Sequence, residues 1–69
     1  MKVSARNVLM GKVKRVTAGA VNSEVVLELP GGQEVVSIIT RESAGSLGVA
    51  AGMKAYAVIK ATEIMIGVD

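Results

Sequence analysis

Residues 23–40, SEVVLELPGGQEVVSIIT, form the stretch that decides the fold. Two runs rich in valine, isoleucine and leucine, residues 23–29 and 34–40, lie on either side of a Pro-Gly-Gly-Gln sequence. β-Branched residues favour strands, and proline and glycine favour the tight turn between them. The stretch therefore predicts an antiparallel β-hairpin.

Short strand-like runs also occupy most of the remaining chain. Residues 3–9 and 11–17 carry branched residues interleaved with polar ones, and Lys14-Arg15 interrupts the alternation of the second run. An interruption of this kind indicates a bulge. The six predicted strands are residues 3–9, 11–17, 23–29, 34–40, 54–60 and 63–68.

One segment, residues 41–47, contains no β-branched residue. Thr40 before it is a favourable N-cap and Gly48 after it suits a left-handed C-terminal position, so one or two helical turns are expected, weakened by Gly45. Five or six short strands with one helical turn indicate an all-β fold, a small OB-like Greek-key barrel, in a single domain spanning residues 1–69. A β-sandwich is the alternative, although the chain is short for two full sheets.

The composition indicates that the chain associates with copies of itself. A domain of 69 residues buries only about 60% of the surface that its unfolded chain exposes. It has no cysteine or histidine, which excludes disulfides and the usual zinc sites. Yet 51% of the residues are hydrophobic and the mean hydropathy is +0.51, so the excess apolar surface must be buried elsewhere. No apolar run is long enough to span a membrane and residues 1–7 lack a signal-peptide core, so a cytoplasmic location is expected.

The residue types also argue against catalysis. Without histidine or cysteine the usual nucleophilic triads cannot be assembled. Glu24 and Glu28, four residues apart on one strand, are typical of a solvated face, and no nucleotide-binding glycine motif is present. The chain is predicted not to be an enzyme and to hold neither a metal cation nor an organic cofactor.

Nucleic-acid binding is the alternative function, because OB-folds often bind single strands. Such sites stack bases on aromatic side chains, and Tyr56 is the only aromatic residue. The net charge of +2 is small and the basic residues are scattered. A purely structural assembly subunit, which would bind no ligand, is a third interpretation.

Several hydrogen-bond donors are better explained by an anion. Ser4 and Arg6 share one face of a strand, since they are two residues apart. Each donor alone has a structural explanation, but together they form a site rich in donors that requires no acceptor. Such a site favours a fully deprotonated tetrahedral anion such as molybdate, tungstate or sulfate over phosphate, which usually carries a proton. The donors are contributed by Ser4, Arg6, Thr40, Ser43, Lys60 and the turn at Ala61 and Thr62.

Four motifs also carry a family resemblance. They are SARN at 4–7, GAVNSEV at 19–25, ITRES at 39–43 and IKAT at 59–62. Together they resemble the molbindins, the Mop-type proteins that consist of a stand-alone TOBE domain. The resemblance implies an OB-like barrel that exchanges strands in a dimer, a hexamer of three dimers, and storage of molybdate or tungstate in the cytoplasm.

The resemblance also implies the binding residues. Ser4, Arg6 and Lys60, with the turn at Ala61 and Thr62, match molybdate contacts at the dimer interface. Thr40 and Ser43 match contacts that the partner subunit contributes to the same pocket. A second oxyanion site between dimers is assigned to the turn of Gly19, Ala20, Val21 and Asn22. The chain has Val8 where the family often has a polar residue, and Val8 is expected to point away from Arg6.

Overall fold

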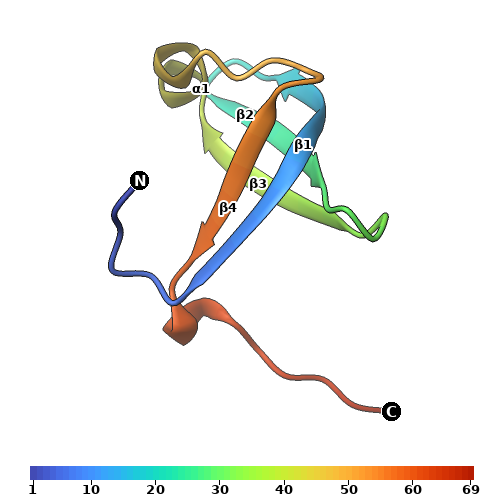
Figure 1. Ribbon diagram of the computed structural model, residues 1–69. Coiled ribbons are helices and arrows are strands. Elements are labelled where there is room, and N and C mark those ends of the chain that lie inside the picture. Colours follow the sequence, from blue (N-terminus) through green and yellow to red (C-terminus); the bar gives the residue numbers. More distant parts are fainter.

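The hairpin expected from residues 23–40 is present in the computed structural model, which describes all 69 residues (Figure 1). Its two strands pair antiparallel, and the turn is closed by the Leu29 N–H donated to the Gln33 carbonyl at 2.8 Å. Gly32 has a φ of +89°, a left-handed conformation that glycine adopts without strain. The elements of the chain are β1 (Asn7–Ala18), β2 (Asn22–Glu28), β3 (Glu34–Thr40), α1 (Arg41–Leu47), β4 (Lys54–Ile59) and the 3-10 turn η1 (Ala61–Glu63).

The four strands form one curled antiparallel sheet in the order β3-β2-β1-β4. Residues 7–9 and 11–17 of the first two predicted strands belong to the single long strand β1, whereas residues 3–6 precede it, so Ser4 and Arg6 do not lie on a strand as expected. Gly11 does not end the strand, because its missing side chain lets the backbone of β2 approach: a Cβ at Gly11 would lie 2.6 Å from the Glu28 carbonyl oxygen. The predicted bulge is confirmed, since the β1–β2 register shifts between Val13 and Arg15.

The last predicted strand, residues 63–68, is wrong for the isolated chain. The chain turns through η1 after β4 and then extends away from the sheet with Met65 93% and Val68 92% exposed (Figure 1). A strand requires a neighbouring strand to bond to, and no strand of the same chain pairs with this segment. The fold is thus mostly strand, but with four strands in place of the expected five or six. Residues 64–69 are called the tail below.

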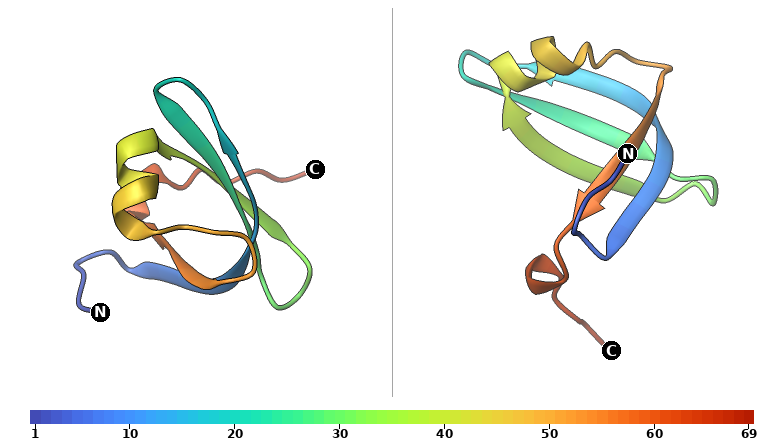
Figure 2. Two further views of the ribbon diagram at one scale, coloured as in Figure 1. Left: turned by 90° about the horizontal axis from the view of Figure 1, so that it is seen from above. Right: turned by 60° about the vertical axis from the view of Figure 1, so that its left-hand side comes forward.

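The predicted helical turn is confirmed as α1, which lies across one end of the curled sheet (Figure 2). The Thr40 side chain accepts a hydrogen bond from the Ser43 N–H at 3.0 Å, and Gly48 adopts a φ of +67° at the C-terminus. Ala44 is the only residue of the helix that is buried.

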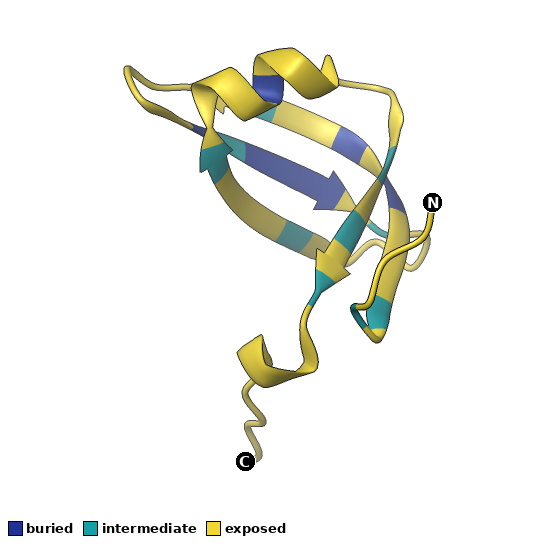
Figure 3. Cartoon of the chain, turned by 90° about the vertical axis from the view of Figure 1, so that its left-hand side faces the viewer, coloured by how far each residue is buried: buried dark blue, intermediate teal, exposed yellow.

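The core lies inside the curl and is small. Val13, Val25 and Leu27 form its centre, and partly buried side chains of β3, β4 and the loop after α1 surround them. Only 7 of the 69 residues are buried, so most of the apolar side chains remain on the surface (Figure 3). No helix of the structure has the length and apolar character that crossing a membrane demands.

Candidate functional site

A hollow of about 320 Å³ lies at the end of the sheet opposite α1, and this end is called the foot of the sheet below. Asn7 and Ile59 form the last pair of the β1–β4 ladder, and beyond this pair the two chain segments separate. The N-terminal arm before β1 supplies one wall, and the turn after β4 supplies the other (Figure 1). The lining residues are Ser4, Ala5, Arg6, Lys60, Ala61 and Thr62. Five of the residues selected from the sequence therefore share one hollow, although they come from the two ends of the chain.

Local structure explains why the turn presents donors to this hollow. Its single backbone hydrogen bond runs from the Glu63 N–H to the Lys60 carbonyl at 2.9 Å. The N–H groups at the start of a helical turn have no carbonyl partner within the turn. Ala61 and Thr62 accordingly donate no backbone hydrogen bond in the chain.

The charges around the hollow are all positive. Arg6 and Lys60 line it, and no carboxylate does. The only ion pair of the chain joins Lys14 to Glu34, so neither Arg6 nor Lys60 is neutralised by an acidic side chain. Two cations, two hydroxyl groups and free N–H groups around one space are suited to an anion rich in oxygen acceptors.

Asn7 links β1 to β4 at the point where the two walls of the hollow separate. It is not among the site residues selected from the sequence. Its side-chain amide donates to the Ile59 carbonyl at 3.4 Å, a long hydrogen bond between residues 52 positions apart. The signal available in the sequence was the position of Asn7 directly after Ser4-Ala5-Arg6.

Thr40 and Ser43 do not join the hollow within one chain. They lie at the start of α1, where the Thr40 hydroxyl is 2.8 Å from the Ser43 hydroxyl and also caps the helix. The segments that line the hollow, residues 4–6 and 60–62, and the start of α1 lie at opposite ends of the sheet (Figure 1).

The turn of Gly19, Ala20, Val21 and Asn22 also lies apart from the hollow. Its groups are partly used within the chain: the Gly19 N–H donates to the Asn22 carbonyl at 2.7 Å, and the Val21 carbonyl accepts from the Arg41 N–H at 2.8 Å. These bonds tie the β1–β2 turn to the start of α1. None of its residues lines the hollow at the foot of the sheet.

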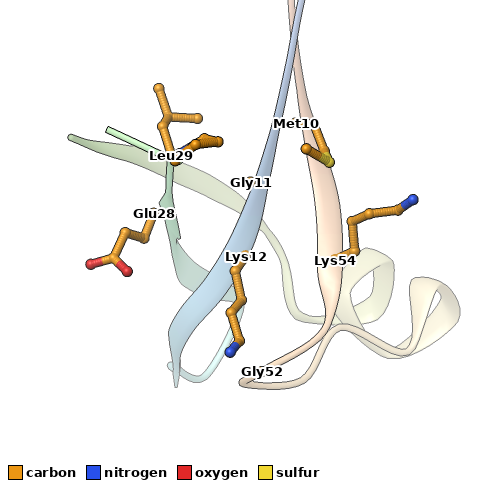
Figure 4. Close-up of a pocket in the computed structure, with 8 residues that line it drawn as sticks. Met10, Gly11, Lys12, Glu28, Leu29, Gly52 and Lys54 are labelled. Carbon is orange, nitrogen blue, oxygen red and sulfur yellow. The ribbon is translucent and has the colours of Figure 1, made fainter. Parts of the chain in front are cut away.

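Another hollow, larger at about 390 Å³, has a different character. Lys12, Lys54 and Glu28 border it, but their charged ends extend in different directions (Figure 4). They do not converge on a point where one small ligand could contact all of them. The hollow between the arm and the turn is therefore the better candidate.

Comparison with known proteins identifies the family. The model of the TOBE domain matches residues 3–66, and the chain belongs to this family. A relative from Clostridium pasteurianum, molybdenum-pterin-binding protein 3, is 53% identical over 66 residues, which cover 96% of this chain and 97% of the relative.

Two solved structures are also closely similar. A molybdate-binding protein from Sporomusa ovata superposes with a TM-score of 0.92 at 37% identity, covering 99% of this chain and 100% of that one. The cytoplasmic molybdate-binding protein ModG, with molybdate bound, gives a TM-score of 0.95 at 48% identity. That match covers 100% of this chain and 49% of the ModG chain.

Proposed function

We propose that this protein binds molybdate, and tungstate in its place, in the hollow between the N-terminal arm and the turn after β4. The observation that carries the proposal is the meeting of Ser4, Arg6 and Lys60 around one space without any carboxylate. A dianion without a proton needs donors alone, so this set of residues suits it. The close similarity to molybdate-binding proteins supports the same ligand.

The chemistry of the hollow favours an inorganic ion over a large organic ligand. Its lining includes neither an aromatic ring nor a carboxylate that could hold a planar heterocycle. Tyr56 lies on another part of the molecule, with the Lys54 ammonium 5.7 Å from its ring centre. The same absence of stacking groups disfavours a nucleic-acid site.

We infer that a second copy of the chain completes the pocket. The hollow is open to solvent, and Thr40 and Ser43 of the partner subunit would supply further hydroxyl donors from its open side. The Ser43 hydroxyl can accept from Thr40 and still donate to an oxyanion. A further oxyanion site at the Gly19–Asn22 turn, between dimers, is part of the same proposal.

The tail offers a means for two copies to pair. An apolar groove of about 160 Å³ opens between the unpaired edges of β3 and β4, lined among others by Val35, Ile39 and Ala57. The tail carries Ile64, Met65, Ile66 and Val68, all exposed in the isolated chain. We propose that the tail of one copy adds a strand to the groove of its partner, which would close each barrel, and that three such dimers form a hexamer. The assembly would store molybdate in the cytoplasm and would have no catalytic activity.

Native mass spectrometry with and without molybdate tests this proposal in one measurement. A hexamer that gains several molybdate ions, with little displacement by excess sulfate, is the expected result. Calorimetry on the same sample should show binding at neutral pH. A chain that binds sulfate and molybdate equally, or binds single-stranded oligonucleotides instead, would contradict it.

A further inference from the structure

The charges that line the hollow at the foot attract a dianion but do not distinguish one dianion from another. Molybdate and sulfate are both tetrahedral, both doubly charged and both free of protons at neutral pH, so Arg6 and Lys60 attract them alike. The two ions differ in size, and sulfate is the smaller. A site that prefers the larger ion must hold its donors at a fixed spacing, because donors that can move will follow either ion.

Few contacts hold the two walls of the hollow at their spacing. Residues 1–6 of the arm take part in no backbone hydrogen bond, and the single backbone hydrogen bond of the turn, from Glu63 to Lys60, stays within the turn. No side-chain hydrogen bond or ion pair joins the arm to the turn. Beyond the last pair of the β1–β4 ladder, the two walls are therefore not bonded to each other.

Asn7 forms the side-chain contact nearest to both walls. Its amide donates to the Ile59 carbonyl at 3.4 Å, at the pair where the ladder ends. Asn7 directly follows Arg6, and the Ile59 carbonyl belongs to the same planar peptide group as the Lys60 N–H. The bond thus orients the peptide group from which the turn begins relative to the residue that follows Arg6. Asn7 is half-buried and does not line the hollow, so it acts on the walls without touching an anion there.

We propose that Asn7 is a positioning residue that gives the hollow its preference for molybdate over sulfate. The inference rests on the proposed function, since it concerns the same hollow. By fixing the arm and the turn in one relative orientation, the Asn7 amide makes the donors of both walls match a tetrahedron of one size. Hydrogen bonds weaken as their distance and angle depart from the ideal, so fixed donors penalise an ion of the wrong size. Arg6 and Lys60 supply the attraction, and Asn7 supplies the selectivity.

The Asn7→Leu variant tests the inference, because leucine is similar in size to asparagine and has no donor. Molybdate affinity should fall about threefold to tenfold, the usual effect of losing a neutral hydrogen bond. Sulfate affinity should change less, because loosened walls can close on the smaller ion. Calorimetric titrations of molybdate with and without excess sulfate give the ratio of the two affinities, which should fall by a similar factor. A general loss of folding would lower both affinities together and leave their ratio unchanged.

Two further variants separate the hydrogen bond from other changes. Asn7→Asp keeps the shape of the side chain, but its carboxylate is ionised at neutral pH and cannot donate. The added charge repels both dianions alike, so the affinity ratio should fall as it does in Asn7→Leu. Gln33→Leu is the matched control, since it also replaces an amide by an apolar side chain, in the β2–β3 turn where the Gln33 side chain forms no hydrogen bond. Its ratio should equal that of the unmodified protein.

Amide hydrogen exchange, followed by NMR without any anion, tests the same contact independently of binding. The Glu63 N–H, hydrogen-bonded within the turn, should exchange faster in Asn7→Leu than in the unmodified protein. The Gly48 N–H, hydrogen-bonded at the end of α1, should exchange at the same rate in both. Unchanged exchange at Glu63, or an unchanged ratio of molybdate to sulfate affinity in Asn7→Leu, would overturn this inference and leave the proposed function standing. An unmodified protein that binds neither anion would overturn the proposed function, and this inference with it.

Discussion

The two ends of the curled sheet both present hydroxyl and N–H donors, but the structure uses them differently. At the helix end, Thr40 caps α1 and also contacts the Ser43 hydroxyl, so its groups are satisfied within the chain. At the foot, Ala61 and Thr62 have free N–H groups beside the unpaired cations Arg6 and Lys60. Donors that satisfy one another stabilise a fold, whereas donors that converge without partners indicate a ligand. We therefore propose the foot as the principal anion site and the helix end as an auxiliary one.

The largest effect is expected at the foot. Arg6→Ala should weaken molybdate binding by about 1.5–3 kcal/mol, the usual contribution of a hydrogen bond to a charged group. Thermal stability should change little, because the Arg6 side chain forms no hydrogen bond or ion pair in the chain. Calorimetry on this variant and on Lys2→Ala, which removes a charge outside the hollow, provides the comparison. Equal affinities for the two variants would remove Arg6 from the site.

The helix end should respond mainly in stability. Thr40→Ala removes the cap of α1 and should lower the free energy of unfolding by about 1 kcal/mol. Urea unfolding of the variant, with and without molybdate, measures the effect. Thr40→Ser keeps the hydroxyl and serves as the matched control. A stable Thr40→Ala protein would show that the cap contributes little.

Ser43→Ala separates the two roles of the helix end. The Ser43 N–H still donates to Thr40 in this variant, so the cap remains and stability should be nearly unchanged. Molybdate binding should weaken by about 0.5–1.5 kcal/mol if the partner's Ser43 donates to the anion. Unchanged calorimetric affinity would exclude Ser43 from the pocket and leave the helix end purely structural.

The smallest effect is expected at the Lys14–Glu34 ion pair, in which the two charges already neutralise each other. The ammonium of Lys14 hydrogen-bonds to the Glu34 carboxylate and lowers its pKa below the usual 4.5. A lowered pKa in the folded state means that the contribution of the pair to stability is fully present above this usual value and is lost as the pH falls below it, through the lowered pKa. In the Glu34→Gln variant the free energy of unfolding should therefore fall slightly less steeply as the pH is lowered below about 4.5. Its molybdate affinity at neutral pH should equal that of the unmodified protein, since the pair lies outside the hollow.

The hairpin and the helix could be predicted because local chemistry determines them. The Pro-Gly-Gly turn, the Thr40 cap and the left-handed Gly48 each act within a few residues of the chain. The length of β1 could not be predicted, because a glycine between two strand-like runs usually indicates a break in the strand. Only the structure shows that Gly11 is required by the close approach of the β2 backbone. The tail was expected to be a strand from its composition, but a strand forms only where another strand is available to bond with it.

The site was predictable in its residue types and only partly in its geometry. Donor chemistry and the family resemblance selected Ser4, Arg6 and Lys60, and the structure places all three at one hollow. The role of Asn7 depends on its pairing with Ile59, a contact across 52 positions that no local pattern contains. In the proposed dimer, the placement of Thr40 and Ser43 beside the hollow would depend on a second copy of the chain, and no local pattern in the sequence specifies where that copy lies.

The location of bound molybdate tests the central claim most directly. Crystals grown with molybdate and measured near the molybdenum absorption edge would reveal the metal by its anomalous scattering. The account predicts a peak within hydrogen-bonding reach of the side chains of Ser4, Arg6 and Lys60, with its oxygens facing the Ala61 and Thr62 N–H groups. A peak beside Lys12 and Lys54 instead, with the hollow at the foot empty, would contradict it.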